Sequence, residues 1–184
     1  TVDHALTITV GNNSSEWELH LYSDADLAKC PFTKRSTSGV FLEITSSHTS
    51  AAVTGNSTKQ TAMSESTPEA ELVAASKAIK TAGIPILDLL EAMFKRTVQL
   101  TCFEDNEATQ KVIENGYSPN LRHLGRVHGT SIGRLHDCFI DPENKVANMK
   151  HIQSEDMKAD IFTKSFMEIP KWRHVVEMIG IRAK

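Results

Sequence analysis

Four acidic residues stand where the sequence predicts that a strand ends or a helix lies. They are Asp24 and Asp105, each after a predicted strand, Glu71 in the first turns of a predicted helix, and Asp160 within a late helix. Hard divalent cations such as Mg²⁺ prefer oxygen ligands. Converging carboxylates could hold two ions about 3.5 to 4 Å apart, which activate a water and stabilise the leaving oxygen of a phosphodiester. The pattern therefore indicates metal-dependent phosphodiester hydrolysis.

Each of these residues also has a simpler structural interpretation. Asp24 and Asp105 are residue types that cap turns and helices, and Glu71 would be favoured in a first helical turn by the helix dipole. Asp160 would ordinarily be an exposed helical residue. Their joint arrangement favours the metal site, because adjacent parallel strands carry their ends to one edge of a sheet, where a helix can add carboxylates.

The remaining sequence predicts the elements that must position these carboxylates. Apolar alternation and turn residues predict a hairpin between strands near 6–10 and 17–22, and further strands at 39–44, near 51–54 or 59–64, at 97–103 and at about 145–152. Helix signals predict helices at 67–82, resuming after a break near Gly83 and Pro85 to Phe94, a short one through Val112, and others at 121–135, 154–166 and 170–179. Strands come first as a meander and then alternate with helices, so we expect an α/β fold with a mixed sheet.

Composition narrows the class of protein further. The chain has 184 residues, of which 40% are hydrophobic, and this fits one domain. Its net charge of -3 gives no overall basic field, so nucleic-acid binding would have to be local. Three widely spaced cysteines indicate reduced thiols in an intracellular compartment, and no apolar run reaches the roughly 20 residues of a membrane helix. Neither terminus carries a boundary signal, so we expect a piece of a longer chain.

Five motifs occur in a fixed order: YSDAD, KRSTSG, KQTAMSESTPEAELVAA, EDNEAT and ADIFTK. Together they resemble the ribonuclease H domain at the carboxyl end of copia-type LTR retrotransposon polyproteins. The resemblance covers residues 17–180, leaving 1–16 as an N-terminal hairpin strand or connection. It implies a ribonuclease H-like fold with a mixed five-stranded sheet flanked by helices. It also implies a cytoplasmic retroelement particle or the nucleus as location, and a reverse transcriptase domain of the same polyprotein as partner.

The resemblance also implies an activity and a set of catalytic residues. The activity is cleavage of the RNA strand of an RNA–DNA hybrid with two Mg²⁺ or Mn²⁺ ions, held by Asp24, Glu71, Asp105 and Asp160. Glu69 is the rival of Glu71, which is preferred because the family's catalytic glutamate is the second one of its TEAE-like motif. No sequence feature calls for an organic cofactor.

His151 precedes Asp160 by nine residues. Many ribonucleases H place near there a histidine that assists product release or proton transfer, a task suited to its near-neutral pKa. A histidine at a strand end with no catalytic task is the favoured interpretation. His151 nevertheless stays a candidate catalytic residue.

Candidate contacts to nucleic acid are fewer than the family pattern would give. They are Lys34, Arg35, Lys59, Asn106, Arg122 and Arg126. On a helix over 121–135, Arg122, Arg126 and Arg134 would share one stripe, which is either a row for phosphates or, as we favour, a solvated basic face. The helix could instead be partly broken by its glycines. Where relatives commonly have a Trp-Ser-Ser-Lys-Lys-Gln-like run, this chain reads VTGNSTKQ, and Glu65 stands where arginine is usual, so we expect weak hybrid binding.

Three functions are therefore compatible with the sequence. The first is an active ribonuclease H, and the second is a catalytically weak or inactive module of the same fold recruited into a larger assembly. The third is another metal nuclease, because a fold does not fix the substrate. Retention of all four acidic residues favours the first.

Overall fold

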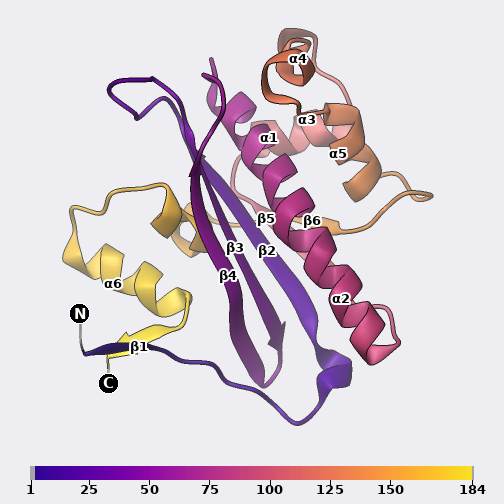
Figure 1. The fold of residues 1–184 in the computed structure, drawn as a ribbon, viewed down its shortest axis with the longest axis vertical. Helices are drawn as coiled ribbons and strands as arrows, with labels where there is room; N and C mark the ends of the chain where they lie inside the picture. Colours follow the sequence, from indigo (N-terminus) through magenta and orange to yellow (C-terminus); the bar gives the residue numbers. More distant parts are fainter. Residues whose placement is uncertain (1–2, 184) are drawn as a thin grey trace.

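The computed structural model describes residues 3–183, and its centre is a sheet of five strands. The strands are β2 (Glu18–Asp26), β3 (Thr37–Ser46), β4 (Thr49–Lys59), β5 (Leu100–Glu104) and β6 (Asn148–His151). They lie in the order β4-β3-β2-β5-β6. β2, β3 and β4 form an antiparallel meander, whereas β5 runs parallel to β2 and β6 parallel to β5. The predicted mixed five-stranded sheet is confirmed (Figure 1).

Helices cover both faces of this sheet (Figure 1). One face carries α1 (Thr67–Ala78), the π-helical turn η2 (Ile79–Gly83), α2 (Ile84–Phe94), α3 (Glu107–Asn115) and α5 (Ile132–Phe139). The other carries the 3₁₀ helix η5 (Lys158–Phe162) and α6 (Ile169–Met178). Successive side chains of β2 point to opposite faces of the sheet and pack in both layers. Leu21 lies in the apolar cluster under α1, and its neighbour Tyr22 lies in the cluster under η5.

The predicted break near Gly83 and Pro85 does not occur. α1, η2 and α2 follow one another without interruption and form a single rod across the sheet (Figure 1). The wider π turn before Pro85 accommodates this proline without ending the helix. A Cβ atom on Gly83 would lie 3.0 Å from Leu21 Cδ2 and 3.2 Å from Leu100 Cδ2, so the glycine permits close packing on the sheet.

Two other predicted helices are interrupted. The segment 121–135 forms α4 (Leu124–His128) and α5, separated at Gly129, whose φ of +64° ends α4 in the left-handed region. Arg134 therefore lies on a different helix from Arg126. The segment 154–166 forms two 3₁₀ helices, η4 (Ser154–Asp156) and η5, because Met157 between them is extended and fully buried.

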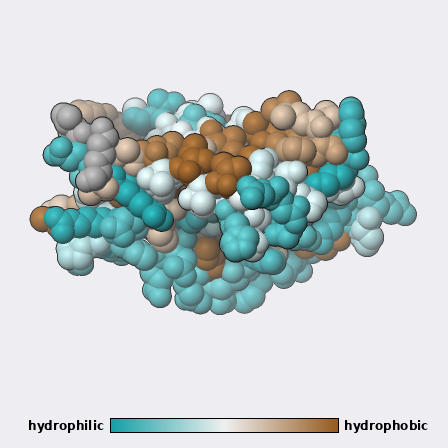
Figure 2. All heavy atoms as spheres, turned by 90° about the horizontal axis from the view of Figure 1, so that it is seen from below, coloured by the Kyte–Doolittle hydropathy of each residue, from teal (hydrophilic) through white to brown (hydrophobic). Residues whose placement is uncertain are grey.

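The predicted hairpin between residues 6–10 and 17–22 is wrong. β1 (His4–Leu6) pairs instead with β7 (Ile181–Ala183) in a separate two-stranded sheet, and a 3₁₀ turn η1 (Ser14–Glu16) leads into β2. Between β1 and η1 the chain passes along the lower side of Figure 1 and carries the exposed Ile8 and Val10. Figure 2, viewed from this side, shows apolar side chains gathered in a band among polar ones.

The poorly marked strand is a single long one, β4, that covers one of the two predicted positions, 51–54. It lies at the edge of the sheet, where most of its side chains are exposed, so its small polar residues show little alternation. The 3₁₀ turn η3 (Pro119–Leu121) completes the elements. Among the described residues, no helix combines the length and apolar character needed to cross a membrane.

Candidate active site

Asp24 lies inside β2, past the point where β5 stops pairing with it. Pairing with β5 ends at Tyr22, whereas pairing with β3 continues to Asp26. The sequence predicted the strand end at residue 22, and the partner β3 explains why β2 continues. The Asp24 side chain is 2% exposed and accepts a hydrogen bond from the hydroxyl of Thr163. A buried carboxylate thus stands on the central strand next to the open end of β5.

Glu69 and Glu71 are both buried near the start of α1 but have different surroundings. One oxygen of Glu69 lies 3.0 Å from His123 Nε2 and 3.2 Å from His128 Nε2, and the other accepts a backbone hydrogen bond. Among the described residues, Oε2 of Glu71 has no hydrogen-bond partner. Side chains two residues apart on a helix point about 200° apart. Glu71, rather than Glu69, faces Asp24.

Two acidic residues lie together at the end of β5. Asp105 follows the strand, and its Oδ2 accepts a hydrogen bond of 2.7 Å from the hydroxyl of Ser154. Glu104 is 3% exposed, accepts a bond of 3.1 Å from the backbone N–H of Asn106 through Oε1, and leaves Oε2 without a partner in the described chain. Sequence reasoning missed Glu104, whose only signal was its place beside Asp105.

The structure brings Asp24, Glu71 and Asp105 together, with one carboxylate oxygen of each within 4.8 Å of the other two. Burial and then the charges of Glu104 and Asp24 raise the pKa of Glu71 well above its usual range. Burial likewise raises the pKa of Glu104. Carboxylates held this close repel one another unless a proton or a cation compensates them.

Asp160 reaches the same site from η5 on the opposite face, and Lys164 joins it to Asp24. Lys164 Nζ lies 2.6 Å from Asp160 Oδ1 and 3.3 Å from Asp24 Oδ1. Burial and then the neighbouring carboxylates raise the pKa of Asp160 to about 6, although the bond from Lys164 opposes this. Burial alone would lower the pKa of Lys164, but the charges of Asp24 and Asp160 outweigh burial and raise it. Lys164 was missed as a site residue, although it stands in the ADIFTK motif four residues after Asp160.

The donor set fits a hard divalent cation. Asp24, Glu71 and Asp105 converge as carboxylates, with the ammonium group of Lys164 on one side of Asp24. The buried oxygens of Glu71 and Glu104 that have no partner among the described residues are free to act as ligand atoms. A buried carboxylate oxygen without a partner is costly, and metal coordination removes this cost. Asp24, Glu71 and Asp105 can therefore hold Mg²⁺ or Mn²⁺, with Asp160 available beside them.

The raised pKa values predict how stability depends on pH without metal. Glu71→Gln should unfold at a higher temperature than the wild type near pH 8, by about 3 °C or more, because about 1 kcal/mol corresponds to ~2–4 °C at this size. The folded wild type holds the Glu71 proton more tightly than the unfolded chain, so this contribution to stability is lost as pH rises above the ordinary pKa. The difference should shrink towards pH 4.5. Thermal unfolding with a chelator measures it, and a Glu71→Gln protein less stable than wild type at pH 8 would contradict it.

His151 ends β6 beside Glu104, its pairing partner on β5. Its ring nitrogen Nδ1 lies 3.2 Å from Gln110 Nε2, which also donates to the carbonyl oxygen of Glu104. The imidazole is exposed. It thus lies at the same end of the sheet as the carboxylates, and its catalytic role stays a prediction.

Several predicted nucleic-acid contacts are engaged with the protein itself. Lys59 Nζ lies 3.0 Å from Cys30 Sγ, and this contact is the main cause that lowers the pKa of Cys30 to about 6. Arg35 donates to the carbonyl oxygen of Thr61 at 3.1 Å. Asn106 caps α3. Its role in binding stays a prediction, as do those of Lys59 and Arg35.

The other predicted basic contacts are exposed to solvent. Lys34 lies in the loop after β2 with a φ of +54°. Arg122 donates from Nε to the hydroxyl of Tyr117 at 2.8 Å and lies over its ring. Arg126 projects from α4. These three side chains are accessible to a ligand.

The chain matches no protein-family model and no curated protein sequence. Its fold is similar to that of RNase H1 from the halophilic archaeon Halobacterium salinarum NRC-1, with a TM-score of 0.53 and 16% identity over 79% of this chain and 94% of that one. LC11-RNase H1, isolated from compost by a metagenomic approach, aligns with a TM-score of 0.47 and 17% identity over 79% and 92%. Together with the sheet order and the flanking helices, the archaeal structure shows that this chain has a ribonuclease H-like fold.

Proposed function

We propose that the chain is a metal-dependent ribonuclease H that cuts the RNA strand of RNA–DNA hybrids, as part of a copia-type retrotransposon polyprotein. The observation that carries this proposal is the convergence of Asp24, Glu71 and Asp105 on a ribonuclease H-like sheet. The five ordered motifs support it independently. A fold alone does not fix an activity, so the acidic site is essential to the argument.

The chain's own side chains would set the positions of the reacting groups. Two Mg²⁺ or Mn²⁺ ions held by Asp24, Glu71, Asp105 and Asp160 would supply an activated water and charge stabilisation at the leaving oxygen. Thr163 and Lys164 fix the orientation of Asp24, and Ser154 fixes that of Asp105. Such supporting contacts keep ligand carboxylates in place before substrate binds.

Hybrid recognition would depend on backbone shape and 2′-hydroxyl groups rather than on base sequence. The basic side chains available for it are few, and Lys59 is turned towards Cys30. We therefore propose that residues 17–180 act as the catalytic domain and that a tethered reverse transcriptase supplies affinity through high local concentration. Residues 1–16 would be the connection. The location would be a cytoplasmic retroelement particle or the nucleus.

The exposed arginines Arg122 and Arg126 give a test of hybrid binding. Changing either to alanine should weaken binding and lower the slope of log affinity against log salt by about 1, because each phosphate contact releases about one counterion. Cleavage at saturating hybrid should change little. Arg173→Ala on α6, which covers the other face of the sheet, is the matched control. If Arg122→Ala and Arg126→Ala leave the affinity and the salt slope unchanged, these two arginines form only a solvated face.

The alternative is a module that keeps the fold but has lost useful catalysis. The reduced basic character around VTGNSTKQ favours it, whereas the intact carboxylates oppose it. A fusion to a reverse transcriptase domain distinguishes the two. If the isolated chain is slow but the fusion cuts hybrid readily, the enzyme is correct; if both are inert at high enzyme and Mg²⁺ concentration, the module is correct.

A further inference from the structure

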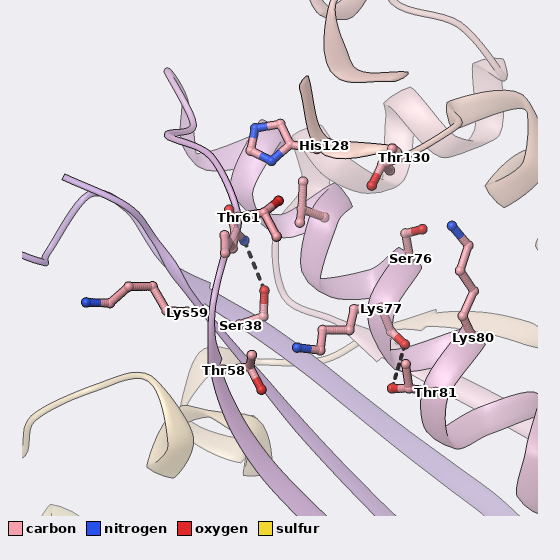
Figure 3. A pocket seen from close by; sticks show the side chains of 13 residues that line it. Ser38, Thr58, Lys59, Thr61, Ser76, Lys77, Lys80, Thr81, His128 and Thr130 are labelled. Atoms are coloured by element: carbon pink, nitrogen blue, oxygen red, sulfur yellow. Dashed lines mark hydrogen bonds between the residues drawn. The ribbon is translucent and has the colours of Figure 1, made fainter. Parts of the chain in front are cut away.

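A hollow lies between the end of β4 and α1, and none of the four carboxylate residues of the acidic site lines it (Figure 3). It has a volume of about 240 Å³, and we call it the β4–α1 hollow. Its walls include Ser38, Thr58, Ser76 and Lys77, and residues 128–130 lie across one end. Lys59, a predicted nucleic-acid contact, also lines it, although its ammonium group lies 3.0 Å from Cys30 Sγ. The function proposed above makes no use of the other lining residues.

The hollow opens on a different side of α1 from the carboxylates. Lys77 follows Glu71 by six residues, which is about 9 Å along the helix and a rotation of roughly 240°. Glu71 faces the ends of β2 and β5, whereas Lys77 faces β4. Figure 3 shows the Lys77 side chain extending from the helix towards Thr58 and Ser38. A ligand there would not touch the acidic cluster.

The charge in the hollow is uncompensated. Among residues 3–183, no Asp or Glu lines it, whereas Lys59, Lys77 and Lys80 all do. Lys77 is only partly exposed and forms no ion pair with any residue of 3–183. Burial lowers the pKa of Lys77. An ammonium group that is partly removed from water without a counter-ion is unfavourable, and a bound anion would relieve this cost.

Hydrogen-bond donors surround this charge. Ser38 is 1% exposed, and its hydroxyl accepts a bond of 3.0 Å from Gln60, which leaves its own proton to donate. The hydroxyl-bearing residues Ser76 and Thr130 are 3% and 4% exposed and line the same space. His128 lies at its end, where its Nε2 donates to Glu69 Oε1 at 3.2 Å, so the donors of the hollow are the hydroxyl groups. The hollow thus offers several donors to one ligand.

We propose that the β4–α1 hollow binds a phosphate group, with Lys77 as its charge partner and the hydroxyl groups as hydrogen-bond donors. Phosphate presents more acceptor oxygens than a carboxylate and is bound by lysine as a point charge. A nucleic-acid strand and a free mononucleotide carry the same group, so either is a source. The proposal does not rest on ribonuclease activity.

Amide NMR titrations of the full chain in metal-free buffer test this site, because without metal the acidic cluster repels anions. The probes are inorganic phosphate, AMP and a short single-stranded oligonucleotide. We expect saturable shifts at the amides of Ser38, Thr58, Ser76 and Lys77. Tighter binding of the oligonucleotide than of AMP identifies a strand as the source, and the reverse order identifies a mononucleotide. Phosphate that gives no saturable shift at these amides overturns the proposal.

Lys77→Gln should weaken phosphate binding about tenfold, the effect expected when a charge-assisted contact is lost. Lys111→Gln removes the same charge from an exposed position on α3 and should bind as the wild type does. Thermal unfolding should show Lys77→Gln at least as stable as wild type without ligand, but with its stabilisation by phosphate reduced. Lys77→Met, which keeps the apolar stem, provides the second variant should Lys77→Gln fail to fold. Equal weakening by Lys77 and Lys111 variants would mean general charge attraction and would overturn the site.

Discussion

Asp24→Asn is expected to reduce Mg²⁺-dependent hybrid cleavage by at least about a thousandfold while the protein stays folded. Asparagine keeps the size of the side chain and an oxygen that can accept the hydrogen bond from Thr163. It removes the negative charge that Asp24 shares with Glu71 and Asp105 at the cation site. The measurement is single-turnover cleavage of a labelled hybrid, with circular dichroism to confirm the fold.

Asp88→Asn is the matched control for this loss. Asp88 is exposed on α2, 17 residues after Glu71 in the same continuous helical rod, which is about 25 Å along its axis. The same charge is therefore removed far from the site. Cleavage by Asp88→Asn should equal that of the wild type. An Asp24→Asn protein that cuts hybrid at a rate within about tenfold of the wild type would exclude Asp24 as a metal ligand.

The two buried glutamates of α1 should separate stability from catalysis. Glu69→Gln should lower the free energy of unfolding by about 2–3 kcal/mol. The NH₂ group of the new glutamine would face hydrogen-bond donors that now bond to a carboxylate oxygen of Glu69. Those donors are the backbone N–H of Glu65 and the rings of His123 and His128. The unfolding temperature should fall by roughly 5–10 °C, and cleavage well below it should change less than tenfold.

Glu71→Gln should show the opposite behaviour. Within residues 3–183, Oε2 of Glu71 has no hydrogen-bond partner, and the neighbouring carboxylates repel it, so neutralising Glu71 should not destabilise the metal-free protein. Cleavage should fall by about a thousandfold, as for Asp24→Asn. Thermal unfolding and single-turnover cleavage of both variants give the comparison. Loss of cleavage in Glu69→Gln with normal activity in Glu71→Gln would reverse the assignment.

Sequence reasoning located the carboxylates because they lie in short motifs and at element ends. The closeness of the ends of β2 and β5 could be predicted, because adjacent parallel strands of an α/β sheet end at the same edge. Glu104 and Lys164 were missed because their places beside Asp105 and in the ADIFTK motif assign them no role. Each belongs to the site through a residue of a distant segment: Glu104 through the charges of Glu71 and Asp24, and Lys164 through its contact with Asp24. The part that Glu104 and Lys164 play in the site could not be predicted without the fold.

The incorrect predictions of secondary structure have similar causes. Pairing of β1 with β7 joins the two ends of the chain, and a local alternation pattern carries no information about such a partner. The helical rod continues through Pro85 because a π turn and the close packing of Gly83 on the sheet accommodate it. The segment 154–166 leaves the helix because Met157 is drawn into the core. Tertiary contacts override local propensity in each case.

The most direct test of the account is cleavage by the wild-type chain of three matched substrates, an RNA–DNA hybrid, duplex RNA and duplex DNA, each with Mg²⁺ and with a chelator. Enzyme is used in excess, so that weak binding does not hide the chemistry. We expect cuts in the RNA strand of the hybrid, only with Mg²⁺, and none in either duplex. Cleavage of duplex DNA or duplex RNA at a rate equal to that of the hybrid, or hybrid cleavage that persists in the chelator, would contradict it.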